Sequence, residues 1–310
     1  MNFPSQPNLV LTPQQLEDWM AQARSQAKSG RLPTYIAKLA IAQADWFAAH
    51  VRLLNGTTYA VGGTQLTFAL MSVIKPLLLL YLLETLGAEP IWSRIGTLPS
   101  DQSFNSIAQL QKDQGFPRNP MLNSGAIALA SLMPGSSGTE RCRYLCQWLN
   151  QWAGCRLTLD AAMLSAVRSL PNERNRAIAQ VLAQAGRLAS SVAVAIDTYE
   201  QICCLAGTAT DLSQLGLLLV DPHTDLRPAH QRQVVALMAT CGMYERSSQF
   251  ALEVGLPAKS GVSGALLAVV PRCGAIACYS PPLDPAGNSA GGVAFLAQIS
   301  RALNLNIFGP

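Results

Sequence analysis

A chain of 310 residues, of which 49% are hydrophobic and 13% charged, is long enough to bury a large core. This balance excludes a disordered chain, which combines few apolar residues with a high net charge. The net charge of +4 at pH 7 comes from 22 basic and 18 acidic residues that are spread along the sequence. Because no run of Lys or Arg marks a phosphate-binding face, we expect no nucleic-acid partner.

The sequence carries no signal for export or for membrane insertion. Its first residues, "MNFPSQPNLVLTPQQLEDWM", lack a basic segment followed by an apolar one, as a signal peptide would have. The longest apolar run, Pro76 to Leu83, has eight residues, whereas a membrane span needs about 20. We therefore expect a soluble, cytoplasmic protein without a membrane partner.

The two ends of the chain carry the strand signals. After a helix predicted for Gln14 to Lys28, with Thr12 as its N-cap, two apolar runs flank the Asn-Gly pair at 55–56, a strong hairpin signal. Near the C-terminus, "GALLAVVPRCGAIACYSPP" repeats the pattern of strand, glycine-containing turn and strand. A final helix follows, with Asn288 or Ser289 as its cap.

Residues 104–250 show helical patterns and almost no strand signal. We therefore predict an α+β fold, in which an antiparallel sheet built from both chain ends is flanked by helices and an all-helical subdomain is inserted between them. The α/β subdomain should comprise about residues 1–90 and 250–310, and the helical subdomain about 91–249. Together they form a single domain that covers residues 1–310.

Two common kinds of enzyme site find no support. The segment "GNSAG" at 287–291 matches the G-x-S-x-G motif of hydrolases, but residues 292–310 contain no Asp, Glu or His to complete a triad. Ser289 is therefore interpreted as a helix cap. Neither a P-loop nor a G-x-G-x-x-G motif follows a strand, so a nucleotide-binding enzyme is not indicated.

Metal chemistry is equally unsupported. Asp221, His223 and Asp225 alternate in a polar segment, but nothing fixes the geometry of that segment, and we interpret it as a solvated loop. The eight cysteines are scattered without a C-x-x-C pair, which is typical of buried thiols and not of a zinc site. We expect neither a metal nor another cofactor.

A serine–lysine pair is the strongest catalytic signal. In "MSVIKP", Ser72 and Lys75 are spaced i, i+3, which puts both side chains on one face of the helix predicted for this apolar segment. A charged lysine is unfavourable in the first turn of a buried helix, because desolvation and the helix dipole both disfavour the ammonium. Both effects lower the pKa of Lys75, and a neutral amine can act as the general base for the Ser72 hydroxyl.

A second motif makes this interpretation more specific. Lys259, Ser260 and Gly261 form a K-S-G tripeptide directly before the C-terminal hairpin. A strand with K-[ST]-G beside an S-x-x-K helix is the arrangement of the penicillin-recognising serine enzymes. In that arrangement the N–H groups of Ser72 and Val262 would form the oxyanion hole, with Lys259 as structural support of the site.

With these residues identified, the chain resembles the serine-dependent glutaminase family, which shares the β-lactamase/D,D-peptidase fold. The similarity runs from about Gly30 to Phe308 and includes "GRLPTYIAKLA", "NPMLNSGAI", "TYEQICCLAGTATDLSQLG" and "LPAKSGVSGALLAVVP". It implies hydrolysis of L-glutamine to L-glutamate and ammonia through an acyl-enzyme on Ser72, activated by Lys75. It also implies a homo-oligomer, a dimer or a tetramer.

The same resemblance implies further site residues. Tyr244 matches a tyrosine that assists proton transfer, and it contacts substrate together with Ser72. The other implied substrate contacts are Tyr35, Asn123, Asn175, Tyr199 and Val262.

Arg168, Met71 and Gly63 depart from the family pattern, and Arg168 bears most directly on the substrate. Members usually carry a glutamate for the substrate's α-ammonium group seven residues before the asparagine that corresponds to Asn175, but this chain has Arg168 there. A cation would repel that ammonium unless Glu173 reaches into the site. A related serine–lysine hydrolase that acts on another amide or on a β-lactam therefore stays open as the alternative at this stage.

Overall fold

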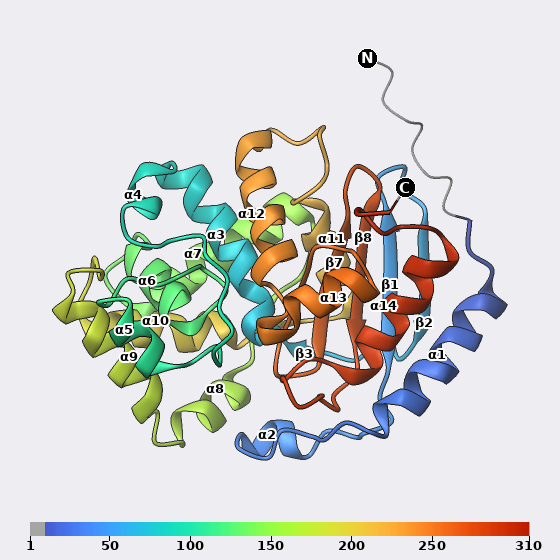
Figure 1. Ribbon diagram of the computed structural model, residues 1–310, viewed down its shortest axis with the longest axis horizontal. Helices are drawn as coiled ribbons and strands as arrows, with labels where there is room; N and C mark the ends of the chain where they lie inside the picture. The colour runs from blue at the N-terminus through green and yellow to red at the C-terminus, as the bar shows by residue number, and fades with distance from the viewer. Residues whose placement is uncertain (1–9, 310) are drawn as a thin grey trace.

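The computed structural model describes residues 10–309, and its centre is a five-stranded antiparallel sheet with the order β2-β1-β8-β7-β6. The two chain ends meet in this sheet, because β1 pairs with β8 and places His50 opposite Ala277 (Figure 1). This confirms the predicted α+β fold and both predicted hairpins. The strands of this sheet are β1 (Ala48–Leu53), β2 (Thr58–Gly62), β6 (Ala258–Ser260), β7 (Ala265–Val270) and β8 (Gly274–Tyr279).

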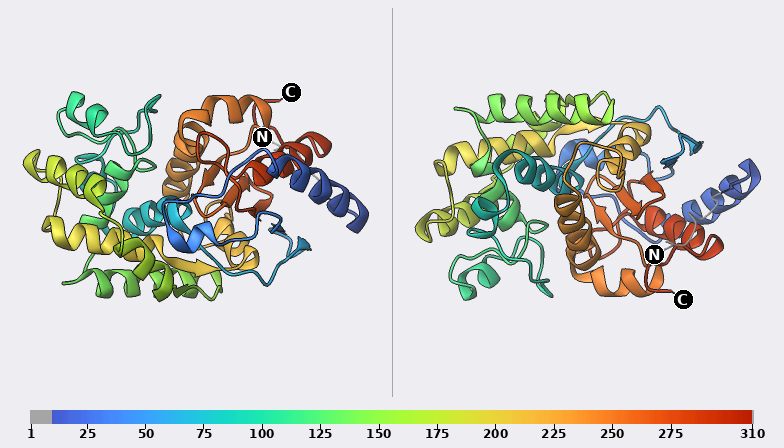
Figure 2. Two further views of the ribbon diagram at one scale, coloured as in Figure 1. Left: turned by 90° about the horizontal axis from the view of Figure 1, so that it is seen from below. Right: turned by 90° about the horizontal axis from the view of Figure 1, so that it is seen from above.

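Helices cover both faces of the sheet (Figures 1 and 2). Strand β7 shows the reason, since Leu266 and Ala268 join one apolar cluster whereas Leu267 and Val269 join the other. Helices α1 (Pro13–Ala27) and α14 (Ala290–Ala302) pack together over the first face, and α11 (Ala209–Leu217) packs on the second. The predicted caps are confirmed, because Thr12 caps α1 in a capping box and Ser289 caps α14.

The remaining helices lie mostly in the other half of the molecule, and those within residues 104–250 confirm the helical prediction for the middle of the chain (Figure 1). They are α2 (Ala37–Ala40), α3 (Ile74–Leu86), α4 (Glu89–Trp92), α5 (Ile107–Lys112), α6 (Asn123–Leu132), α7 (Gly138–Ala153), α8 (Ala161–Arg168), α9 (Glu173–Gln184), α10 (Val192–Cys203), α12 (Pro228–Cys241) and α13 (Ser247–Glu253), with the 3-10 helices η1 (Met71–Val73) and η2 (Tyr244–Arg246).

A second, small sheet was not predicted. It has the order β3-β5-β4 and consists of β3 (Phe68–Ala69), β4 (Thr158–Leu159) and β5 (Leu205–Gly207). Strands of two or three residues are too short to show an alternating pattern, and β5 follows directly on the apolar end of α10. The sequence therefore gave no sign of them.

Helix α3 lies between the two halves of the molecule (Figure 1). It contacts α6 and α7 on the helical side and follows η1, which packs against β6 and β7 of the large sheet. Its residues Ile74–Leu83 are all buried, as the apolar run predicted. The start of this helix therefore places Ser72 and Lys75 where the two halves meet.

Candidate active site

The start of α3 opens into a cavity of about 600 Å³, which is large enough for a small-molecule ligand. The helical half and the segments next to the large sheet both contribute to its wall. Six of the predicted site residues line it: Tyr35, Ser72, Asn123, Asn175, Tyr199 and Val262. The structure thus brings together residues that are more than 200 positions apart in the sequence.

Ser72 is held at the base of this cavity by a tight turn. It lies in η1, which leads directly into α3, and the i, i+3 spacing puts it on the same face as Lys75 in the first turn of α3. The preceding residue, Met71, has a φ of +48°, which is unusual for a residue with a long side chain. The end of β6 packs against this turn so closely that a Cβ added at Gly261 would lie 2.7 Å from the carbonyl oxygen of Leu70. Val262, which follows Gly261, lines the same cavity as Ser72.

Lys75 is completely buried and has a perturbed pKa. Its Nζ donates hydrogen bonds to the carbonyl oxygen of Met121 at 3.0 Å and to Oδ1 of Asn123 at 2.8 Å. Burial disfavours the ammonium and lowers the pKa of Lys75 to about 8. Within residues 10–309 no carboxylate forms an ion pair with Nζ, so no neighbouring anion restores the pKa of Lys75 to its usual value.

Asn123 connects three other predicted residues: Lys75, Tyr199 and Asn175. Its Oδ1 accepts hydrogen bonds from Lys75 and, at 3.0 Å, from the hydroxyl of Tyr199. Its Nδ2 donates to Oδ1 of Asn175 at 3.0 Å. Because Asn123 is the first residue of α6, Tyr199 belongs to α10 and Asn175 to α9, this network fixes three helices around the cavity.

A second network runs below Ser72 on the sheet side. The carbonyl oxygen of Ser260 accepts hydrogen bonds from Nζ of Lys259 at 2.6 Å and from the hydroxyl of Tyr244 at 3.0 Å. Nζ of Lys259 also lies 4.0 Å from the centre of the Tyr244 ring. Burial lowers the pKa of Lys259 far below its usual value, and Lys75 lowers it further. Burial raises the pKa of Tyr244, although a hydrogen bond with the Ser72 side chain opposes this shift.

The position of Arg168 corrects one expectation. Arg168 lies at the end of α8, does not line the cavity, and forms ion pairs with Asp197 and with Glu200, the latter at 3.6 Å between Nε and Oε2. The positive charge of Arg168 is therefore compensated by two carboxylates, and its side chain lies outside the cavity wall. Glu173 is exposed and does not reach into the cavity, whereas Glu200, which the sequence analysis did not single out, does line it.

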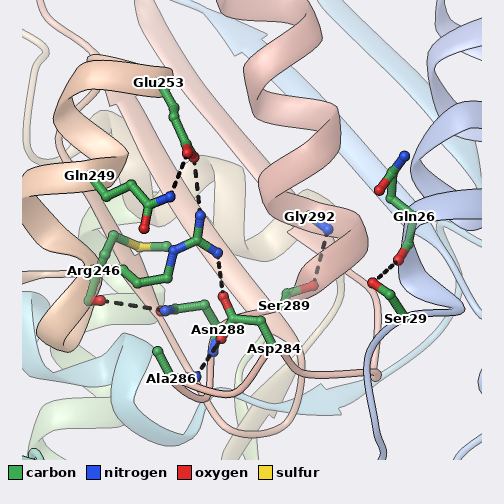
Figure 3. A network of polar contacts seen from close by, with 11 residues as sticks. Gln26, Ser29, Arg246, Gln249, Glu253, Asp284, Ala286, Asn288, Ser289 and Gly292 are labelled. Carbon is green, nitrogen blue, oxygen red and sulfur yellow. Dashed lines mark hydrogen bonds and ion pairs between the residues drawn. The ribbon is translucent and has the colours of Figure 1, made fainter.

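The sequence analysis also missed an ion-pair network beside the cavity, formed by Arg246, Glu253 and Asp284 (Figure 3). Arg246 pairs with Asp284 at 2.6 Å and with Glu253 at 3.0 Å. Oδ1 of Asp284 accepts hydrogen bonds from the backbone N–H groups of Ala286 and Asn288. The loop 283–288, which contributes to the cavity wall, is thereby tied to the segment that carries Tyr244.

The other polar residues that we considered lie elsewhere. Among residues 10–309, no three His, Cys, Asp or Glu side chains are grouped so that they could hold a metal ion. His50 contacts Ser213 and His230 contacts Glu84, both away from the cavity. The described helices include none that is both long and apolar enough to cross a membrane.

A serine and a buried lysine at the start of a central helix, beside a K-S-G strand of an antiparallel sheet, define the β-lactamase-like class of serine enzymes. Comparison with known proteins narrows this class. The family model "Glutaminase" matches residues 30–308, which is nearly the whole chain. The protein therefore belongs to the glutaminase family.

Individual relatives agree with this assignment. The chain is 43% identical to a glutaminase of Synechocystis sp. over 299 residues, which cover 96% of this chain and 91% of that protein. It superimposes on the structure of the probable glutaminase ybaS with a TM-score of 0.88 and 34% identity, covering 97% and 100% of the two chains. A covalent complex of Bacillus subtilis glutaminase YbgJ with 5-oxo-L-norleucine matches with a TM-score of 0.86 and 29% identity, covering 95% and 99%.

Proposed function

We propose that this glutaminase hydrolyses L-glutamine to L-glutamate and ammonia through a covalent acyl-enzyme on Ser72. The observation that carries the mechanism is the placement of Ser72 on the wall of a cavity, one 3-10 turn before the buried Lys75. The covalent complex described for the Bacillus subtilis relative supports a nucleophile that attacks a glutamine-like ligand.

The contacts of Lys75 suit it to be the base. A neutral amine has two N–H groups and one lone pair. Its two hydrogens can be donated to Met121 and Asn123, which leaves the lone pair for the Ser72 proton. The Ser72 oxygen then attacks the side-chain amide carbon, and the negative charge that develops on the amide oxygen is stabilised by the N–H groups of Ser72 and Val262.

The second half of the reaction returns the proton. The proton taken by Lys75 passes to the amide nitrogen, the C–N bond breaks, and ammonia leaves. We assign assistance of this transfer to the Tyr244 hydroxyl, which donates a hydrogen bond to the carbonyl oxygen of Ser260 and whose pKa is influenced by the Ser72 side chain. A water molecule then attacks the ester, again with Lys75 as base, and L-glutamate leaves with Ser72 regenerated.

The remaining roles follow from position. Tyr35, Asn123, Asn175 and Tyr199 would contact the substrate from the cavity wall, whereas Lys259 supports the site through Ser260. Steady-state ammonia release tests the function, with L-glutamine compared with asparagine and N-acetylglutamine. Hydrolysis of a chromogenic β-lactam is measured beside them by its absorbance change. Preference for any of these over glutamine would contradict the proposal.

The activity should depend on pH through Lys75. Because the neutral amine is the active form and burial lowers the pKa of Lys75 to about 8, kcat/KM should rise with pH and level off above about pH 8. At pH 7 roughly one tenth of the side chains would be neutral. A pH profile of kcat/KM for glutamine checks this, and a limb centred near 10.5 would contradict it.

We also propose, from the family resemblance, a cytoplasmic homo-oligomer built from one domain with two subdomains. Size-exclusion chromatography with light scattering should give a mass of two or four times 33.1 kDa. A mass of one chain at micromolar concentration would contradict the oligomer.

A further inference from the structure

Glu200 is a buried carboxylate at the cavity wall. It follows Tyr199 on α10, and only 9% of its side chain is exposed. A charged group in this position is costly unless other groups compensate it. Nδ2 of Asn172 donates a hydrogen bond to Oε1, and Nε of Arg168 lies 3.6 Å from Oε2.

These two contacts do not saturate Glu200. An ionised carboxylate offers about four acceptor positions on its two oxygens, so positions that face the cavity are left. Burial raises the pKa of the Cys203 thiol, which lines the same cavity, and Glu200 raises that pKa further.

The local charge balance is negative despite Arg168. One guanidinium is shared between Asp197 and Glu200, so the three side chains carry a net charge of −1. Arg168 itself is 44% exposed and lies outside the cavity wall, whereas Glu200 is part of the wall. A ligand in the cavity therefore meets the carboxylate and not the guanidinium.

We propose that Glu200 binds the α-ammonium group of the substrate, with Arg168 and Asn172 as positioning residues that hold the carboxylate toward the cavity. This rests on the proposed function, since it concerns how the same site recognises a free amino acid. Among the described residues, the cavity wall has one other acid, Glu245, which is exposed at the rim. A desolvated carboxylate binds a cation more strongly than an exposed one, which favours Glu200.

The test compares L-glutamine with 4-carbamoylbutanoate, which is glutamine without its amino group. We expect Glu200→Gln to raise the KM for glutamine roughly 10- to 100-fold, the loss of one charge-assisted hydrogen bond. Turnover of 4-carbamoylbutanoate should change less than about 3-fold, because this substrate has no ammonium group to lose. The wild-type enzyme should prefer glutamine to 4-carbamoylbutanoate, and Glu200→Gln should nearly abolish this preference.

Two further variants make the test specific. Glu173→Gln makes the same chemical change on the nearby helix α9, outside the cavity, and should leave both KM values unchanged. Arg168→Met should reduce the preference for glutamine about 10-fold without changing turnover of 4-carbamoylbutanoate, which a purely structural role would not do.

If Glu200→Gln lowers kcat/KM equally for both substrates, or leaves the KM for glutamine unchanged, the inference is wrong but the proposed glutaminase activity still stands. A wild-type enzyme that releases no ammonia from glutamine would overturn the proposed function and this inference with it.

Discussion

Replacing Ser72 with alanine is expected to lower kcat for ammonia release from L-glutamine by about 10⁴-fold or more. The acyl-enzyme needs an oxygen at this position, and Lys75, Tyr244 and the oxyanion donors all act through it, so their contributions are lost together. The fold should be retained, because removal of one hydroxyl from a turn that packs against β6 leaves no large void. Steady-state kinetics and a thermal unfolding curve measure both effects.

Ser289→Ala is the matched control for this experiment. Ser289 belongs to the G-x-S-x-G segment but caps α14 and donates a hydrogen bond to the carbonyl oxygen of Ser280. Its loss should cost about 1 kcal/mol of stability and leave kcat within about 2-fold of the wild type. The glutamine analogue 6-diazo-5-oxo-L-norleucine, which reacts covalently with a Bacillus subtilis relative, should label Ser72, as peptide mapping would show. Turnover that survives in Ser72→Ala would refute the assigned nucleophile.

Local signals in the sequence were sufficient for most of the fold. The Asn-Gly turn at 55–56 lies between β1 and β2, and Thr12 and Ser289 cap the helices predicted for them. Each of these turns and caps depends on residues within a few positions of one another, so it can be predicted from the local sequence. The i, i+3 spacing of Ser72 and Lys75 is of the same kind.

The partners of the site residues could not be predicted in this way. Lys75 is held by Met121 and Asn123, which lie 46 and 48 positions away, and nothing in their local sequence indicates that contact. Glu200 lies beside Tyr199 in a helix of mostly apolar residues. An acid in such a segment is unusual and could have indicated a functional role for Glu200. The Arg168–Asp197–Glu200 cluster, in contrast, depends on how α8 and α10 pack.

Replacing Lys75 with methionine should lower kcat by about 10³- to 10⁴-fold, which is the upper range for loss of a general base. Methionine keeps the length of the side chain and suits its surroundings, because Lys75 is fully buried. Oδ1 of Asn123 keeps the hydrogen bond from Tyr199, so the network loses one donor and is not dissolved. Stability should therefore change little or rise, as happens when a buried charge-forming group is replaced by an apolar one of similar volume.

The pH profile separates this role from a structural one. If Lys75 is the base, the residual activity of Lys75→Met should lose the rise toward pH 8, because the group that titrates there is gone. Lys259→Met is the matched control, since it removes the second buried lysine and the hydrogen bond to Ser260 but leaves Lys75 in place. That variant should lose activity yet keep an ascending limb near pH 8, because the burial that lowers the pKa of Lys75 is unchanged. A limb near pH 8 that persists in Lys75→Met would assign the base to another group.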